Sequence, residues 1–382
     1  MRFLHTADWH LGRTFHQTSL LEDQEYVLNQ FIQVARDTGP DAIIVAGDLY
    51  DRALPPADAV RLLGWVLEEL VLELQIPVLL IAGNHDSPGR VGFASNLLSR
   101  AGLHIRGTLK GDPSPVVLED AHGPVSFCLL PYAEPPLVRE ALGDETLHTH
   151  DAAMAALTRR IRDGVETERS VLVAHCFATG GQESESERPL TLGGAGNVDT
   201  AHFRAFDYTA LGHLHRPQSL APGVRYSGSL LKYSFSETEH RKSVSLVELD
   251  AAGEVRVEEI PLSPKRDVRV LEGSLSVLLA WPEAYGSVED FLLVRLTDRQ
   301  AILDAMGKLR QAFPNVLHLE RPELFRSDDV EVAGKDRLKE SERELFESFF
   351  REMTGEDLSA EEARIFEEVV DGLRRHQREG SP

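Results

Sequence analysis

The segment Ala42-Ile43-Ile44-Val45-Ala46-Gly47-Asp48-Leu49-Tyr50-Asp51 places two acids directly after a short apolar run. A run of this length, rich in β-branched side chains and ended by glycine, predicts a buried strand. The same order recurs further along, where the run 78–82 ends in Gly83-Asn84-His85-Asp86. Polar side chains that follow buried strands collect at one edge of an α/β sheet, where such folds bind ligands.

Three more predicted strands end in the same manner. Asp8 and His10 follow the strand 2–6, His175 follows the strand 170–174, and His213 and His215 follow the strand 209–211. Amphipathic stretches at 22–37, 56–74 and 88–100 predict helices, and Pro56 and Pro88 stand at first-turn positions that favour proline. Strands that alternate with helices predict a layered α/β core.

The composition indicates a large globular core but carries a charge that is unusual for a DNA-binding protein. The chain has 382 residues, 42% of them hydrophobic, and a formal net charge of -22. This charge argues against a nucleic-acid binder, which usually presents a basic face. We expect part of the acid to lie away from the site, as in the loop of Glu183, Glu185 and Glu187. Bound divalent cations would also invert the local field of a carboxylate-lined site.

The cysteines and the hydropathy pattern predict a cytoplasmic protein. Cys128 and Cys176 are the only cysteines, too few for a disulfide framework. No run approaches the ~18–20 apolar residues that a membrane span needs. The first five residues lead straight to Asp8 and His10, so no signal peptide is expected.

The polar residues at the strand ends have the chemistry of metal ligands. Carboxylate, amide and imidazole groups suit Mn, Fe or Zn better than a soft thiolate site would. Asp48 has two oxygens and could bridge two cations. A cation pair ~3.5–4 Å apart would bind a phosphate and offset the charge on its oxygens.

Five motifs in this order resemble the calcineurin-like metallophosphoesterase superfamily over roughly residues 1–270. The resemblance implies a two-sheet α/β sandwich flanked by helices. It assigns Asp8, His10, Asp48 and His215 to a first cation and Asp48, Asn84, His175 and His213 to a second. His85 would then face the substrate as a general acid or transition-state stabiliser, and Asp51 would orient it.

A narrower resemblance is to the SbcD family of nuclease subunits, which act with an SbcC ATPase. It rests on His5-Thr6-Ala7-Asp8-Trp9-His10-Leu11-Gly12 and on the segment 226–237, which begins Tyr226-Ser227-Gly228-Ser229. It implies two Mn ions per subunit, with Fe, Zn or Mg as alternatives. It also implies a 3'-5' exonuclease on double strands and an endonuclease on single strands and hairpins.

The same family layout implies three parts. They are a nuclease domain at 1–264, a small α+β capping domain at 265–325 that guides DNA, and a C-terminal helix pair at 336–378. Within the cap, the pattern predicts a helix at 299–312 capped by Asp298. In the pair, Ser359 and Glu362 have capping-box spacing.

Two apolar surfaces predict partners. The helices 56–74 and 88–100 are apolar on more than one face, which fits either packing on the sheet or a homodimer interface. The helix pair 336–378 is too small to fold alone. It either packs back on the body or docks on the coiled coil of an SbcC-like ATPase, and the resemblance favours docking.

A DNA nuclease also needs basic side chains that contact phosphate. The candidates near the motif loops are Arg13, Arg52, Arg90, Arg216, Lys232 and Lys242. Two other functions stay open at this point. One is a phosphoesterase of small molecules or phosphoproteins, which the acidic charge favours. The other is a non-enzymatic scaffold for ATPase heads.

Overall fold

A computed structural model describes residues 1–109, 114–187, 196–322, 343, 346–348, 350–351 and 357–379. The chain divides into two compact units. The first comprises residues 1–270 with 289–292, and the second comprises residues 271–288 with 293–382.

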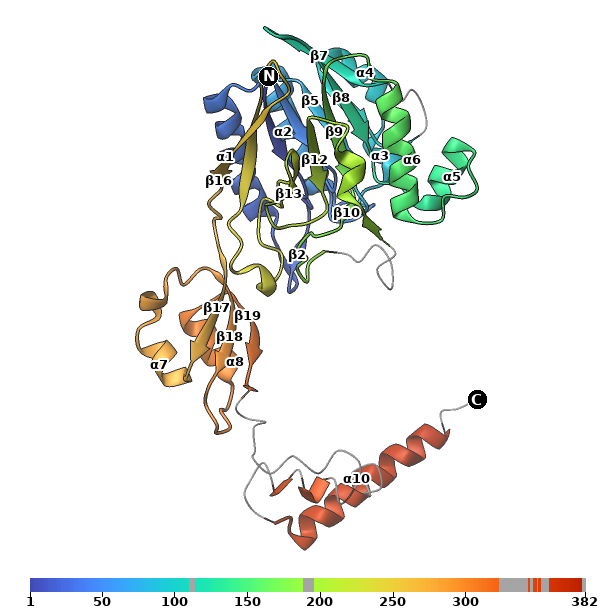
Figure 1. Cartoon of the computed structure of the whole chain (residues 1–382). Coiled ribbons are helices and arrows are strands. Elements are labelled where there is room, and N and C mark those ends of the chain that lie inside the picture. Colours follow the sequence, from blue (N-terminus) through green and yellow to red (C-terminus); the bar gives the residue numbers. More distant parts are fainter. Residues whose placement is uncertain are drawn as a thin grey trace. The chain divides into compact units, whose positions relative to one another are not determined.

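One six-stranded sheet of the first unit contains the first three motif strands, β1, β4 and β5 (Figure 1). Its strand order is β16-β15-β1-β4-β5-β6, in which β1, β4, β5 and β6 are parallel and β15 and β16 are antiparallel additions. The bounds are β1 Arg2–Thr6, β4 Ala42–Val45, β5 Val78–Ile81, β6 Leu103–Arg106, β15 Ser243–Leu249 and β16 Val255–Pro261.

The other six-stranded sheet contains the two later motif strands. Its order is β13-β14-β12-β9-β8-β7, and β14, β12, β9 and β8 run parallel. The bounds are β7 Val116–Asp120, β8 Gly123–Leu130, β9 Arg169–His175, β12 Tyr208–Gly212, β13 Gln218–Ala221 and β14 Val224–Tyr226. Short pairs β2 Thr14–Phe15 with β3 Thr18–Ser19, and β10 Phe177–Ala178 with β11 Asn197–Val198, complete the first unit's strands.

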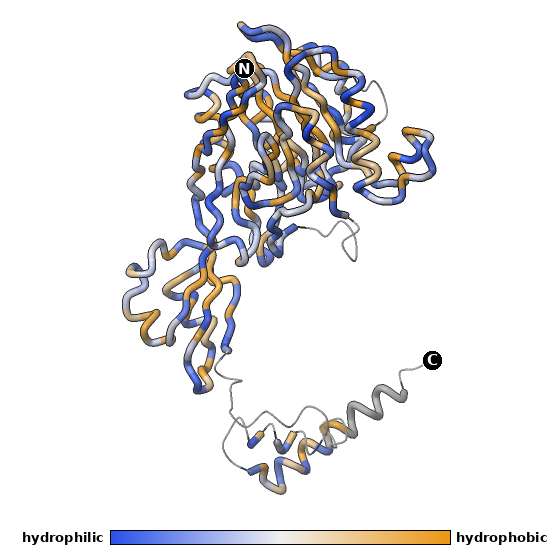
Figure 2. The backbone as a smooth tube through the Cα atoms, viewed as in Figure 1, coloured by the Kyte–Doolittle hydropathy of each residue, from blue (hydrophilic) through white to orange (hydrophobic). Residues whose placement is uncertain are grey.

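The two sheets pack face to face through a mostly apolar layer. Phe3 of β1 packs edge-on against Phe127 of β8 and Tyr208 of β12, at ring-centroid distances of 5.7 and 5.6 Å. Ile44 and Val173 lie in the same buried cluster. Figure 2 shows hydrophobic residues concentrated along these strands and hydrophilic residues toward the outer loops. The predicted two-sheet sandwich is therefore confirmed.

Helices cover the sheets on their outer sides. Helix α1 (Leu21–Thr38) buries Phe31, which packs against Trp9 at 5.8 Å. Helix α2 (Ala57–Glu68) continues as a π-helical turn, Glu69–Glu73. On the second sheet, α5 (Pro135–Leu142) and α6 (His150–Asp163) bury apolar side chains against β8, β9 and β12.

The predicted continuous helix 88–100 is wrong. It is broken into α3 (Pro88–Val91), α4 (Ser95–Leu98) and a 3-10 turn at Ser99–Ala101. The break comes at Ala94, whose φ of 57° is left-handed and cannot continue a helix. Gly92, two residues earlier, is tightly packed, because a Cβ there would lie 3.1 Å from the carbonyl oxygen of Pro88.

A three-stranded sheet of order β17-β18-β19, with two helices, includes residues of both units, because the division falls within β17 and β18. The bounds are β17 Val268–Gly273, β18 Phe291–Leu296, β19 Val316–Glu320, α7 Leu275–Ala280 and α8 Ala305–Ala312. The predicted start of α8 is wrong, because Asp304 caps it by accepting from the Gly307 N–H at 3.1 Å. Asp298 instead accepts from the N–H of Leu275 at 2.7 Å.

The C-terminal helix α10 (Ala360–Glu379) begins as the sequence predicts. The Glu362 N–H donates to Ser359 Oγ at 3.3 Å, and the Ser359 N–H donates to Glu362 Oε2 at 2.9 Å, which completes the capping box. Most of the partner helix predicted at 336–353 lies outside the described residues, but Phe346 stacks on Phe366 at 4.1 Å. Within the described chain, no helix has the length and apolarity to cross a membrane.

Candidate metal centre

The loops that follow the motif strands meet at one edge of the sandwich. The N–H of Asp8 donates to the Gly47 carbonyl at 3.0 Å, and the N–H of His10 donates to the Asp48 carbonyl at 2.9 Å. The His213 N–H bridges from the second sheet to the Asp8 carboxylate at 3.0 Å. This hydrogen bond from a main-chain N–H to a carboxylate brings residues 205 positions apart to one place.

Three of the predicted ligands form a first ligand group, Asp8, His10 and His215. One ligand atom of each lies within 4.8 Å of the others, and all three side chains are buried. The Nε2 atoms of His10 and His215 face each other at 3.1 Å. The Nδ1 atom of His10 has no hydrogen-bond partner among the described residues. Convergent imidazole nitrogens beside a carboxylate are a suitable donor set for a divalent cation.

The second ligand group contains Asp48, Asn84, His175 and His213. Asn84 Oδ1 lies 2.9 Å from His175 Nε2 and 3.2 Å from His213 Nδ1. Asp48 Oδ2 lies 3.5 Å from His175 Nε2 and 3.7 Å from His10 Nε2 of the first group. Asp48 therefore stands between the two groups, where a bridging carboxylate would be needed.

The backbone is strained where these side chains originate. Asp8, His10, Asp48 and His213 have φ values of 55°, 46°, 51° and 118°, a region that residues with a Cβ rarely adopt. Such conformations cost about 1–3 kcal/mol each and cluster at functional sites. Four such conformations at one place indicate that the orientation of these side chains is reached at a cost in folding stability.

Glycines in three of the motif loops, Gly47, Gly83 and Gly212, permit the loops to approach one another closely. A Cβ at Gly83 would lie 2.2 Å from Asp48 Oδ1, and one at Gly47 would lie 2.4 Å from His175 Nδ1. A Cβ at Gly212 would lie 1.9 Å from the Ala46 carbonyl oxygen. Any side chain at these three positions would push the ligand loops apart.

The electrostatics of the site favour bound cations. Burial raises the pKa of Asp8 well above its usual value, so the bare carboxylate is penalised there. Burial lowers the pKa of His10 well below 6.5 and that of His213 to about 3, so both imidazoles are neutral and able to bind a metal. Burial also lowers the pKa of His175, but the Asp48 and Asp8 carboxylates and the Ala46 carbonyl together outweigh it and raise the pKa to about 9. The residues present therefore fit a divalent pair.

His85 is held beside the two groups without joining either donor set. Its Nδ1 donates to the main-chain carbonyl of Asp51 at 2.8 Å, and its N–H donates to Asp48 Oδ1 at 2.8 Å. The ring packs edge-on against His10 at 4.7 Å and is half-buried.

Asp51 contacts His85 in a different way from the one expected. The carbonyl accepts the hydrogen bond, whereas the carboxylate lies 3.5 Å from Arg13 Nη1 and 3.9 Å from Arg52 Nη2. One carboxylate oxygen is still within 4.8 Å of ligand atoms of both His10 and His85. Substitution of the Asp51 side chain would thus leave the hydrogen bond to His85 in place.

Asp86 is a site residue that the sequence analysis did not single out. Its buried carboxylate accepts from the N–H groups of Leu49, Tyr50 and Gly83 at 3.1, 3.0 and 2.9 Å. Burial raises its pKa to about 6. It fastens the Asp48 loop to the Asn84 loop, and its position two residues after Asn84 was the available signal.

The six basic candidates divide into two classes. Arg52, Arg90 and Arg216 are exposed, and Arg13 lies near the ligands above the Tyr233 ring at 4.8 Å. Lys242 is wrong as a DNA contact, because it is buried and its three N–H bonds donate to Glu237, the His215 carbonyl and Ser229. Lys232 is likewise engaged, with Asp267 at 2.9 Å and the Thr238 carbonyl at 2.8 Å.

The sequence predicted that the loop of Glu183, Glu185 and Glu187 lies away from the site, and this prediction is wrong for Glu187. Its Oε1 accepts from the His215 N–H at 2.8 Å, so this acid supports a ligand. Ser186 of the same loop contacts His215 Nδ1 at 2.6 Å, and the buried Glu237 lies behind it. These contacts join segments 28 to 51 residues apart, which spacing alone does not reveal.

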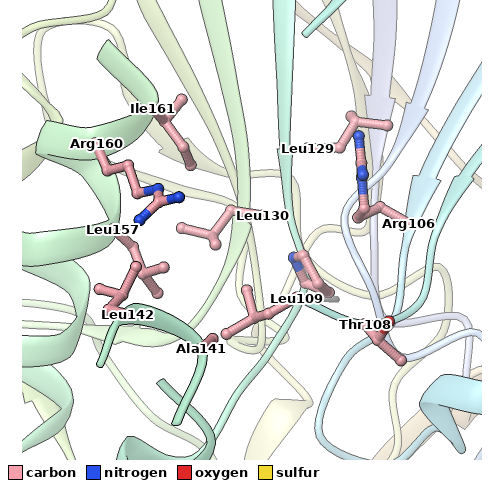
Figure 3. Close-up of a pocket in the computed structure, with 11 residues that line it drawn as sticks. Arg106, Thr108, Leu109, Leu129, Leu130, Ala141, Leu142, Leu157, Arg160 and Ile161 are labelled. Carbon is pink, nitrogen blue, oxygen red and sulfur yellow. The ribbon is translucent and has the colours of Figure 1, made fainter. Parts of the chain in front are cut away.

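The site is separate from a cavity of about 290 Å³ on the second sheet (Figure 3). That cavity is lined by residues of β8, α5 and α6, with Arg160 beside Leu130 and Leu157, and with Arg106 beside Leu129. None of the predicted site residues lines it. The chemistry lies instead at the strand ends.

Comparison with known families agrees with this arrangement. Residues 1–217 match the calcineurin-like phosphoesterases, a stretch that contains every residue of both ligand groups. Residues 264–354 match the family described as the type 5 capsule protein repressor C-terminal domain, or SbcD_C. Structures of a Thermus thermophilus protein and of a dimetal phosphatase from Danio rerio align over 68% of the chain, with 17% and 15% identity and TM-scores of only 0.38 and 0.41.

Curated relatives match over almost the whole length. The D subunit of the nuclease SbcCD from Staphylococcus saprophyticus is 34% identical over 98% of this chain and 98% of its own. The protein of the same name from Staphylococcus epidermidis is 35% identical over 94% of this chain and 95% of its own. The chain therefore belongs to the SbcD family of the calcineurin-like phosphoesterases, whose fold implies a dimetal centre.

Proposed function

We propose that the chain is a manganese-dependent DNA nuclease subunit that works with an SbcC-like ATPase in DNA end processing, repair and recombination. It would act as a 3'-5' exonuclease on duplex ends and as an endonuclease on single strands and hairpins. The observation that carries the proposal is the buried convergence of the two ligand groups beside a half-buried His85.

The ligand groups would hold the cations in the arrangement set out from the sequence. Asp8, His10 and His215 would bind the first, Asn84, His175 and His213 the second, and Asp48 both. When bound, a divalent pair supplies Lewis-acid stabilisation of phosphoryl charge and a lowered pKa for water. The neutral state of His10 and His213 is the one that this binding needs.

His85 and Arg13 would act on the phosphodiester itself. His85 Nδ1 is occupied by the Asp51 carbonyl, so Nε2 is the atom that would donate a proton to the leaving oxygen. Arg13 is held in place by Asp51 and the Tyr233 ring, and its guanidinium would offset phosphate charge. Arg52, Arg90 and Arg216 remain candidates for contacts with more distant phosphates.

A homodimer through the elements 56–74 and 88–100 is part of the proposal. Leu72, Phe93 and Leu97 are 60%, 79% and 70% exposed, although such side chains usually avoid water. Exposed apolar groups gathered on neighbouring elements mark association surfaces. The break in the second helix does not remove this support, because Phe93 and Leu97 flank it.

The C-terminal region would dock on the ATPase coiled coil. Ile365 and Val369, one turn apart on α10, are 49% and 56% exposed. An apolar stripe at this spacing suits a groove between partner helices. This proposal includes the division into 1–264, 265–325 and 336–378, and a cytoplasmic location.

The test is cleavage of end-labelled duplex and hairpin DNA by the purified chain, alone and with an SbcC-like partner, in Mn²⁺ or Mg²⁺. We expect cleavage in Mn²⁺, with products shortened from the 3' end of the duplex. No cleavage of any DNA under any of these conditions, by protein that contains two cations, would overturn the proposal.

A phosphoesterase of small molecules or phosphoproteins is the second candidate, and the net charge of -22 favours it. A small bis-phosphoester tested beside linear DNA separates the two. Faster turnover of the small ester, with DNA untouched, would select the second candidate. A pure scaffold role would require the complete ligand set to be idle, and a protein that binds no cation would support it.

A further inference from the structure

The ring of His215 is supported from behind by a chain of polar side chains. His215 Nδ1 lies 2.6 Å from Ser186 Oγ, and the same hydroxyl contacts Glu237 Oε1. Glu237 is fully buried and pairs through Oε2 with Lys242 Nζ at 2.6 Å. These residues lie on three separated segments, so their convergence on one ring is a product of the fold.

The charge of Glu237 fixes the direction of each hydrogen bond. Lys242 is a buried cation beside it, and an ionised carboxylate can only accept hydrogen bonds. The single hydroxyl hydrogen of Ser186 must therefore point to Glu237. The Ser186 oxygen is then an acceptor toward His215, and His215 Nδ1 must carry the hydrogen.

We propose that Ser186 and Glu237 are positioning residues that hold His215 as its Nδ1–H tautomer, with Lys242 as their counter-ion. The Nε2 lone pair is thereby directed toward His10 Nε2, 3.1 Å away, where the first cation would bind. Lys242 adds a second restraint, because it also donates to the His215 carbonyl at 2.7 Å. This inference rests on the metal centre of the proposed function.

The structure also explains why the gap left by a missing hydroxyl would matter. Glu237 Oε1 is 3.5 Å from His215 Nδ1, too far for a direct hydrogen bond of normal length. Without Ser186 Oγ the ring would have to turn toward Glu237, which would misdirect Nε2. Loss of such outer partners typically weakens metal binding by about 10–100-fold.

The first test is titration of the full-length chain, freed of metal, with Mn²⁺ in a calorimeter. Wild type should bind two ions, and Ser186→Ala should bind one of them about tenfold more weakly. Ser186→Thr, which keeps the hydroxyl, should restore the affinity. Ser236→Ala is the matched control, because that exposed serine contacts the same loop at the Glu185 N–H but not His215.

A second variant guards against misfolding. Glu237→Gln alone would leave Lys242 as an unpaired buried charge, which is strongly destabilising. The double variant Glu237→Gln/Lys242→Met removes both charges. We expect its affinity for one of the two Mn²⁺ ions to fall by roughly 10–100-fold.

The tautomer itself is visible by NMR of histidine-labelled, metal-free protein. We expect a Nδ1–H pattern for His215, assigned with His215→Gln and lost in Ser186→Ala. Full Mn²⁺ affinity at both sites together with an unchanged tautomer in Ser186→Ala and in the double variant would overturn the inference. Wild type that binds no Mn²⁺ but shows the Nδ1–H pattern would instead overturn the proposed metal centre and leave the tautomer assignment standing.

Discussion

The two ligand groups are held by different means. In the second group, His175 donates Nδ1–H to the main-chain carbonyl of Ala46 at 2.9 Å. In the first group, His215 relies on side chains, with Ser186 next to its ring and Glu237 behind. Main-chain support is supplied by the strands themselves and no substitution can delete it. Side-chain support comes from a remote loop and is vulnerable to a single substitution.

Asp48→Ala should have the largest effect, because Asp48 lies between both groups. Loss of several kcal/mol of transition-state stabilisation corresponds to roughly a 10⁴-fold lower cleavage rate. Metal analysis should find both cations depleted. Asp58→Ala, at an exposed position of α2, is the control. Similar metal content in the two variants would contradict the assignment of Asp48 as the ligand that bridges the cations.

His85→Ala should come next. His85 resembles His175 in being oriented by a main-chain carbonyl, yet we propose it as a general acid and not as a ligand of either cation. We expect both cations to stay bound while DNA cleavage falls about a hundredfold or more, the usual contribution of a general acid. Wild-type cleavage in Mn²⁺ by this variant would show that the assigned role is wrong.

Gly83→Ala tests the main-chain framework of the second group. The new Cβ would lie 2.2 Å from Asp48 Oδ1, so the loop must shift. Overpacking of this kind costs about 1–3 kcal/mol, measurable as a lower denaturant midpoint. Gly89→Ala is the matched control, since no atom lies within 4 Å of its Cβ. Equal midpoints for the two variants would mean that the loops are not tightly fixed.

Arg13→Gln should have the smallest effect of the four. Arg13 reaches the Ser186 carbonyl at 2.9 Å as well as facing the site, so it belongs to the side-chain-supported group. If it contacts one phosphate, the salt dependence of DNA binding should fall by about one unit of slope. Arg61→Gln, at an exposed position of α2, is the control. If Arg13→Gln has the same slope as this control, Arg13 does not contact a phosphate and only supports the loop of Ser186.

Much of this site could be predicted because its signals are local in sequence. Asp48 and Asn84 each stand just after a short apolar run, and parallel strands bring such positions to one sheet edge. The Ser359 and Glu362 capping box could be predicted for the same reason. In each case a few neighbouring residues determine the structure.

The parts that could not be predicted depend on distant contacts. Lys242 looked like any basic residue near a motif, but burial against Glu237 removes it from solvent. Glu187 looked like surface acid, yet the fold brings its loop onto His215. The break at Ala94 lies beside a close approach of Gly92 and Gly107, two residues that are distant in sequence, which periodicity does not reveal.

Anomalous diffraction from crystals of the full-length chain grown with Mn²⁺ tests the central claim most directly. We predict two manganese peaks at the strand ends. One should be bound by Asp8, His10 and His215, the other by Asn84, His175 and His213, with Asp48 reaching both. A single peak, or manganese bound by other side chains while these remain free, would contradict the account.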